Sequence, residues 1–119
     1  WQTHTITPAH EHFISVHIRQ KILIHIERLQ SLNPRPVAKT FVLFLPINET
    51  HDIGLLFLNY ELISKGYHTI FLGESVPLED LQLLNNLYTE ITYVSYFTIM
   101  PTQERLSGYL DEFNKTLIN

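Results

Sequence analysis

The sequence predicts an α/β fold: an N-terminal helix followed by a truncated, doubly wound parallel sheet of three βα units with strand order 2-1-3. Three apolar stretches, at residues 41–45, 68–72 and 91–97, have the length of strands, and the segments that follow them have the length and pattern of helices. Strands that alternate with helices are joined by right-handed crossovers, which makes the sheet parallel. The usual order for three such units places the first strand in the centre.

The N-terminal segment predicts one long helix. Thr7 offers a hydroxyl cap and Pro8 suits the first turn, while the prolines that follow Asn33 end the helix near Ser31. Apolar side chains cover most of its circumference, so we expect neighbours on more than one side. We interpret residues 1–36 as the end of a helical bundle with its linker, and residues 37–119 as the truncated sheet domain. One side of the helix is marked by isoleucines that recur every four residues, at Ile14, Ile18, Ile22 and Ile26.

The segments after the strands predict three further helices. A helix over residues 51–65 would stop at Gly66, because glycine is common just past a helix end. Residues 77–88 predict the next helix, and Pro101 opens the last one, which runs towards Leu117. The third strand would lie at an open edge, where a long apolar strand invites aggregation. We therefore expect the chain to be a fragment, with partner helices before it and more strands after it in the whole protein.

Composition limits the function classes. The 119 residues are 45% hydrophobic, which is enough for a core, and they carry a net charge of −4. An acidic chain is a poor match for a phosphate backbone, so we do not expect this segment to bind nucleic acid by itself. The sequence has no cysteine, which excludes disulfides, a thiol nucleophile and a zinc–cysteine site. No apolar run approaches the roughly 20 residues of a membrane helix, and we expect a cytoplasmic protein without membrane contact.

Topology predicts where a ligand would bind. Open parallel sheets hold ligands beyond the carboxyl ends of the strands, where the strand order reverses. With the order 2-1-3, that point lies between the first and third strands, at residues 46–51 and 98–101. These loops lack the glycines of a dinucleotide site or a P-loop, the composition of a flavodoxin-type phosphate loop, and the carboxylate of a response-regulator receiver. The side chains expected at the site are Asn48, Glu49, Thr50, His51 and those of residues 95–98.

The pattern ExHxxG occupies the first strand-to-helix turn. His51 could coordinate a metal, and Glu49 could accept its second N–H, which would fix the tautomer and raise the basicity of the ligand. Gly54 would leave room for a bulky group. The chain has seven histidines, five of them in the first 25 residues, and histidine is both a metal ligand and a proton-transfer group. The alternative is that Glu49 and His51 are ordinary polar residues at a helix N-terminus, and the spacing alone favours it.

Three stretches together resemble the cobalamin-binding domain: residues 49–54 (ETHDIG), 66–73 (GYHTIFLG) and 76–81 (VPLEDL). That family has DxHxxG after its first strand, a second strand bounded by glycines, and a proline at the start of the next helix. The similarity runs continuously from about Phe41 to Phe97. It implies a Rossmann-like domain that binds cobalamin at the site that topology predicts.

A second match lies upstream and indicates one subfamily. Trp1, nine further residues, and then Glu11 and His12 fit the pattern W-x9-EH. This pattern is typical of MerR-type transcriptional regulators, including the light-responsive repressors of carotenoid genes. Such proteins join an N-terminal DNA-binding domain to a helical bundle and a cobalamin-binding domain. The resemblance implies that residues 37–119 are a truncated cobalamin-binding domain, and that DNA is bound through a domain absent from this chain.

The resemblance also implies roles for residues of the first turn and the third strand. His51 would be the lower axial ligand of cobalt, replacing the cofactor's own base, and Glu49 would hold its ring by a hydrogen bond. Gly54 would give clearance for the nucleotide tail, and Thr50 belongs to the same cofactor-binding turn. Ser95 would match the serine that lies near the tail in this family.

The remaining roles fall at the upper face of the cofactor and at one departure from the family. Trp1, Glu11 and His12 would cover the upper face and contact the adenosyl group. Phe97 stands where the family has a leucine beside the tail. Gln2 stands where the light-responsive members have a histidine that can take the upper cobalt position after photolysis. The photochemical endpoint of those members therefore does not carry over directly to this sequence.

We predict a cobalamin-dependent sensory domain of a transcriptional regulator, not an enzyme. Adenosylcobalamin is the expected cofactor, and its binding, or its loss in light, would control a homo-oligomer and the release of DNA. Two alternatives stay open: a cofactor-independent protein-interaction module of the same regulator family, and the cobalamin domain of a methyltransferase or mutase. A simple histidine metal site is a weaker idea, because His10 and His12 are two apart on a helix and diverge.

Overall fold

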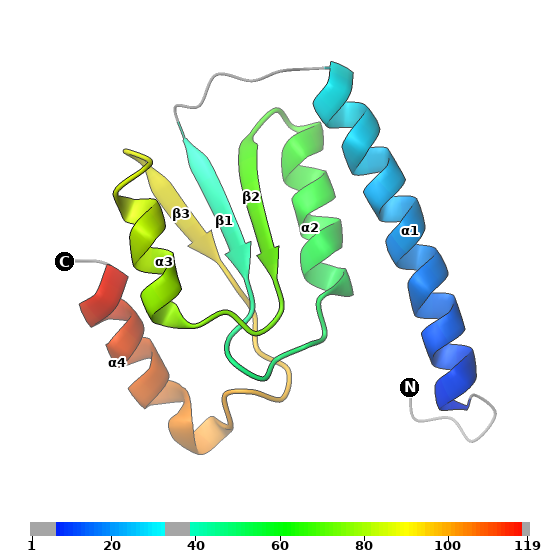
Figure 1. Cartoon of the computed structure of the whole chain (residues 1–119). Helices are drawn as coiled ribbons and strands as arrows, with labels where there is room; N and C mark the ends of the chain where they lie inside the picture. Colours follow the sequence, from blue (N-terminus) through cyan, green and yellow to red (C-terminus); the bar gives the residue numbers. More distant parts are fainter. Residues whose placement is uncertain (1–6, 33–38, 118–119) are drawn as a thin grey trace.

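A computed structural model describes residues 7–32 and 39–117 of the chain (Figure 1). In chain order its elements are α1 (Pro8–Leu32), β1 (Thr40–Phe44), α2 (Ile53–Ser64), β2 (His68–Gly73), α3 (Leu78–Asn85), β3 (Ile91–Val94), the 3-10 turn η1 (Gln103–Arg105) and α4 (Leu106–Leu117). The strands form one parallel sheet in the order β2-β1-β3. The predicted α/β class and the strand order 2-1-3 are therefore confirmed.

The central strand β1 contributes to a separate core on each face of the sheet. Val42 and Phe44 pack with α3 and α4, where Leu81 is fully buried. Leu43 and Leu45 pack on the other face with α2. Successive side chains of a strand point to opposite faces, so a strand covered on both sides has to be apolar throughout. Figure 1 shows these helices on the two sides of the sheet.

Helix α1 is the outer helix on the α2 side of the molecule (Figure 1). Its C-terminal half packs on α2, where Ile26 is buried with Leu56 and Ile63, and Ile22 and Leu29 lie beside it. This contact covers one side of a helix for which the sequence predicts neighbours on several sides. The apolar side chains of its other sides are exposed in the described structure: Phe13, Val16, Leu23, Ile24 and Leu32.

Two predicted helix boundaries are confirmed by their hydrogen bonds. The Thr7 hydroxyl accepts a bond from the backbone amide of His10 at 3.2 Å, which is the expected N-terminal cap of α1. Gly66, with a φ of +94°, follows the end of α2, and its amide donates to the Ile63 carbonyl at 3.0 Å. Glycine adopts this left-handed backbone without the steric cost of a Cβ atom.

The loops at the carboxyl end of the sheet are bonded to one another. The Leu45 amide donates to the Gly73 carbonyl at 2.8 Å, and the Val76 amide donates to the Leu45 carbonyl at 2.9 Å. In the same loop after β2, the Ser75 amide donates to the Glu49 carbonyl at 3.2 Å. The chain that follows β2 therefore supports the turn between β1 and α2 and holds it in one position.

Several predicted boundaries are wrong by two or three residues, including that of α2, which begins at Ile53 instead of residue 51. β3 ends at Val94 instead of residue 97, and α3 ends at Asn85 instead of residue 88. Val94 pairs with Leu43, the last β1 residue in register with β3. Beyond this pair, the amides of residues 98–100 donate to Glu49 and not to a neighbouring strand. The last helical segment begins with η1, so it starts two residues after Pro101.

Candidate functional site

Glu49 is a fully buried carboxylate in the turn between β1 and α2, with an exposed fraction of 0%. Its Oε2 accepts bonds from the Thr98 hydroxyl at 2.7 Å and from the amides of Thr98, Ile99 and Met100 at 2.9, 2.8 and 3.2 Å. Its Oε1 accepts bonds from the amide and the ring Nδ1 of His51 at 3.2 and 2.8 Å. One side chain thus joins the loop after β1 to the loop after β3.

The ionisation of Glu49 follows from these contacts. Burial raises the pKa of a carboxyl group, because it removes the charged form from water. The hydrogen bonds from Ile99, Thr98 and His51 oppose burial and together outweigh it, so the pKa of Glu49 lies well below its usual value. The side chain is therefore a carboxylate, which can only accept hydrogen bonds.

This carboxylate determines which nitrogen of His51 can act as a ligand. Nδ1 of His51 faces Oε1 of Glu49 at 2.8 Å, so Nδ1 carries the proton of the neutral ring. The lone pair then lies on Nε2, and the carboxylate partner holds the ring in this orientation. The side chain of His51 is 61% exposed, whereas that of Glu49 is 0% exposed. The pair has the arrangement of a metal-binding histidine with a buried carboxylate behind it, as the ExHxxG pattern predicts.

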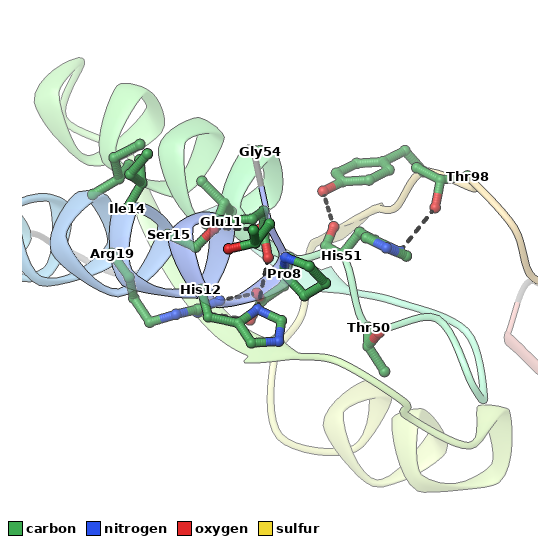
Figure 2. A pocket seen from close by; sticks show the side chains of 15 residues that line it. Pro8, Glu11, His12, Ile14, Ser15, Arg19, Thr50, His51, Gly54 and Thr98 are labelled. Carbon is green, nitrogen blue, oxygen red and sulfur yellow. Dashed lines mark hydrogen bonds and ion pairs between the residues drawn. The ribbon is translucent and has the colours of Figure 1, made fainter. Parts of the chain in front are cut away.

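A cavity of about 950 Å³ lies beside His51, between the N-terminal half of α1 and the carboxyl end of the sheet. Figure 2 shows side chains of α1 and of the turn around His51 at this cavity. The residues that line it are Thr7, Pro8, Glu11, His12, Ile14, Ser15, Ile18, Arg19, Thr50, His51, Asp52, Ile53, Gly54, Tyr96 and Thr98. Five predicted site residues are thereby brought to one cavity: Glu11, His12, Thr50, His51 and Gly54.

On the α1 side of the cavity, Glu11 is held by neighbours on its own helix. Its Oε1 accepts a bond from the Ser15 hydroxyl at 2.5 Å, and its Oε2 lies 2.7 Å from Nδ1 of His12. The bond from Ser15, followed by that from His12, lowers the pKa of Glu11. The carboxylate therefore presents acceptors at the cavity wall. Glu11 lies on the helical stripe that packs on α2 three turns later, at Ile22, and at Glu11 itself this stripe faces the cavity, where a charged residue is tolerated.

An ion pair that the sequence reasoning missed joins α1 to the sheet domain. Nη1 and Nη2 of Arg19 donate to Oδ2 and Oδ1 of Asp52 at 3.0 and 2.5 Å. The hydrogen bond to Asp52 also raises the pKa of Arg19. Asp52 precedes α2 directly, inside the ExHxxG turn, so the pair fixes the position of α1 over the cavity. One sequence signal existed: Arg19 is eight residues after Glu11, and therefore on the same helical stripe.

The sequence predicts Tyr96 at the end of the third strand, among the residues expected at the site, but assigns it no role. Its hydroxyl donates to the His51 carbonyl and accepts a bond from the Leu55 amide at 3.3 Å. Burial raises the pKa of Tyr96, so the hydroxyl keeps its proton. A Cβ atom placed on Gly54 would lie 3.2 Å from the hydroxyl oxygen and 3.6 and 3.8 Å from two ring carbons. The clearance that Gly54 provides is therefore filled by Tyr96.

The other predicted site residues do not all lie at the cavity. Thr50 lines the cavity, whereas Ser95 and Phe97 do not. The Ser95 hydroxyl oxygen is buried without a hydrogen-bond partner in the described structure. The ring of Phe97 contacts that of Tyr109, with centroids 5.7 Å apart, on the α3–α4 side of the sheet. Alternation along the chain explains this split, since Tyr96 points to the face opposite its two neighbours. Trp1 lies outside the described residues.

The possible metal ligands at the cavity are few. Within residues 7–32 and 39–117, no group of three or more histidine, aspartate or glutamate side chains could hold a bare ion. His51 can supply one nitrogen ligand to a metal whose other positions are already filled, as in a metal held by a large planar ring. One histidine nitrogen at the cavity is therefore available to such a metal, while the space beside Gly54 is filled by Tyr96.

Comparison with known proteins shows a similarity to part of a transcriptional repressor. No protein-family profile matches the chain. The chain is 34% identical over 74 residues to the HTH-type transcriptional repressor CarA of Myxococcus xanthus. The aligned part covers 62% of this chain and 25% of that repressor, so the chain spans about a quarter of the length of this curated relative. In the described residues, no helix has both the length and the apolar character needed to cross a membrane. The similarity is therefore to one part of a transcriptional repressor.

Proposed function

We propose that the chain is a cobalamin-binding sensory domain of a MerR-type transcriptional regulator, with adenosylcobalamin as the signal. The observation that carries this proposal is the pairing of a buried carboxylate with a solvent-facing histidine at a large cavity. Glu49 is 0% exposed and fixes the tautomer of His51, whose Nε2 is left to bind a metal. The resemblance of the ExHxxG turn to cobalamin-binding domains supports cobalamin as the ligand, and the similarity to a transcriptional repressor supports a regulatory role.

In this proposal, α1 and the turn between β1 and α2 would each supply contacts to the cofactor. His51 would supply the lower axial nitrogen, and Glu49 would hold that ring while tying down the loop at Thr98. From α1, Glu11 and His12 would contact the upper ligand. Cobalt in the corrin supplies a metal–carbon bond that light can break. Because the upper contacts would come from α1 and the lower ligand from the sheet domain, loss of the upper ligand would remove the contacts of Glu11 and His12, while Arg19 and Ile26 keep α1 packed on the sheet domain.

The biological output of the proposal is a change of assembly. The full-length regulator would form a homo-oligomer with the adenosyl ligand bound, bind DNA through another domain, and release it when the ligand is lost. The exposed apolar side chains of α1, such as Phe13, Val16 and Leu23, agree with a helix that meets other parts of such an assembly. Movement of the N-terminal turns of α1 would then alter these contacts.

The first experiment tests the cobalt ligand. The full-length protein is mixed in the dark with adenosylcobalamin, desalted, and examined by visible spectroscopy before and after green light. We expect retained colour with a base-off, histidine-ligated spectrum, and loss of this spectrum in the variant His51→Ala. The matched control is His10→Ala, because His10 is exposed on α1 and does not line the cavity. Equal spectra and equal retention in the wild type and His51→Ala would contradict the proposal.

One observation favours a second candidate function. Tyr96 fills the space beside Gly54, as a side chain would in a domain that has no need to admit a tail. The chain would then be a cofactor-independent interaction module of the same kind of regulator. A folded full-length protein that retains no colour, but still assembles and represses transcription, would favour this candidate.

A further inference from the structure

Tyr96 occupies the crevice at the point where the strand order reverses. It follows the end of β3, packs with Leu43, Leu45 and Leu55 on the α2 face, and lies against Gly54. In open parallel sheets this crevice is where ligands enter beyond the strand ends. The ring of Tyr96 therefore stands where a part of a ligand would have to go.

The proposed function makes clear which part of the ligand this is. If His51 takes the lower position on cobalt, the base that cobalamin carries there has to leave the metal together with its nucleotide tail. The tail then needs a slot next to His51, and Gly54 is the residue of this turn that lacks a side chain. In this chain the phenol of Tyr96 already lies beside Gly54, so close that an added Cβ atom would meet its hydroxyl oxygen at 3.2 Å.

The position of Tyr96 is held by specific contacts. Its hydroxyl donates to the His51 carbonyl and accepts a bond from the Leu55 amide. The side chain is therefore bonded on both sides of the residues that begin α2. Moving the ring would break these two bonds and expose a packed aromatic surface, and both changes cost free energy. A ligand without a tail would leave Tyr96 in place and avoid this cost.

We propose that Tyr96 is a specificity-determining residue that favours corrinoids without the nucleotide tail over complete cobalamin. This inference rests on the proposed function, because it assumes that His51 binds the cobalt. Complete cobalamin binds only after Tyr96 has turned out of the crevice, whereas cobinamide, the corrin that lacks the tail, binds without this step.

The test compares two probes on the full-length protein in the dark: adenosylcobinamide and adenosylcobalamin. Dissociation constants are measured by equilibrium dialysis with absorbance detection for the wild type, Tyr96→Ala and Tyr96→Phe. The matched control is Tyr93→Phe, because Tyr93 lies on the opposite face, where its hydroxyl bonds to Leu81 and Asn85. Thermal melting followed by circular dichroism shows that each variant is folded.

We expect the ratio of the cobalamin to the cobinamide dissociation constant to fall by about tenfold or more in Tyr96→Ala, since two hydrogen bonds and a packed ring no longer resist the tail. Tyr96→Phe keeps the ring and loses both hydroxyl bonds, so we expect a fall of about threefold, which also tests the inference if the alanine variant does not fold. The ratio should be unchanged in Tyr93→Phe.

Two other results would overturn the inference, and they can be told apart. If both corrinoids bind through His51 and the ratio is the same in the wild type and in both Tyr96 variants, the specificity role of Tyr96 is wrong while the proposed function stands. If neither corrinoid binds to the wild type or to the Tyr96 variants, the proposed function fails and this inference fails with it.

Discussion

The two faces of the sheet use the same central strand for different purposes. On the α3–α4 face, Val42 and Phe44 are covered by apolar side chains such as Leu81, and the contact is closed. On the α2 face, Leu43 and Leu45 are equally buried. At the carboxyl end of this second face, however, the closed packing gives way to a cavity whose lining combines charged and hydroxyl groups with apolar side chains such as Ile14 and Ile18.

The difference follows from the position of α1. Its C-terminal half packs on α2, while its N-terminal half lies over the carboxyl end of the sheet and forms one wall of the cavity. The cavity therefore lies between α1 and the sheet, whereas the α3–α4 face is filled by an apolar core. The proposed ligand site and this second core lie on opposite faces of one strand.

The largest effect that tests this comparison is expected at Glu49. In Glu49→Gln, an amide group would face either the donors of the loop at Thr98 or those of His51, so several buried N–H groups would lose their acceptor. We expect a loss of about 3–5 kcal/mol in the free energy of unfolding, measured by urea denaturation. The comparison variant on the other face is Leu81→Ala, with an expected loss of about 2–5 kcal/mol from the cavity that it creates.

This pair of variants also separates the roles of the two faces. Leu81→Ala should leave ligand binding by the folded fraction unchanged, because Leu81 is far from the cavity lining. A loss below about 1 kcal/mol in Glu49→Gln would show that the loops at the carboxyl end hold together without the buried carboxylate.

A smaller effect is expected where α1 meets the sheet domain. In Arg19→Met, Asp52 loses its bidentate partner, and we expect a loss of about 1 kcal/mol, because the Arg19 side chain is 38% exposed and solvent screens the pair. Unfolding in urea at low and high salt measures this effect, which should shrink in high salt. Arg28→Met is the control, since Arg28 is exposed on the same helix. Equal losses of unfolding free energy in Arg19→Met and Arg28→Met would argue against a specific ion pair between Arg19 and Asp52.

The smallest effect at neutral pH is expected on the closed face, at Tyr109. Its hydroxyl oxygen is buried without a hydrogen-bond partner in the described structure, so Tyr109→Phe should be neutral or stabilising by up to about 1 kcal/mol. Burial, with the charge of Glu112, raises the pKa of Tyr109 to about 12. The unfolded chain releases this proton near pH 10, so the contribution of this group is complete below pH 10 and is lost as the pH rises towards 12.

The variant Tyr109→Phe tests whether Tyr109 causes this loss of stability at alkaline pH. Urea unfolding at several pH values between 8 and 12 should show a steeper decrease of stability for the wild type than for Tyr109→Phe. Parallel pH profiles for the two proteins would contradict burial of the hydroxyl.

Much of the fold and part of the site could be predicted from the sequence, because these features depend on residues close together in the chain. The apolar runs and the caps at Thr7 and Gly66 are local patterns, and the structure confirms them. The hydrogen bond between Glu49 and His51 was predictable for the same reason, since the two residues are two positions apart. The topological rule then placed the loop after β3 beside them.

The tertiary structure alone decided the contacts between distant segments. Arg19 and Asp52 are 33 residues apart, and Thr98 lies 49 residues after Glu49, so no local pattern indicates either contact. The same is true of Tyr96 and Gly54, where the sequence predicted an open space and the folded chain fills it. A sequence shows which residues can bind a ligand or lack a side chain. Which side chain fills the space beside a glycine depends on how distant segments pack, and that is decided only by the fold.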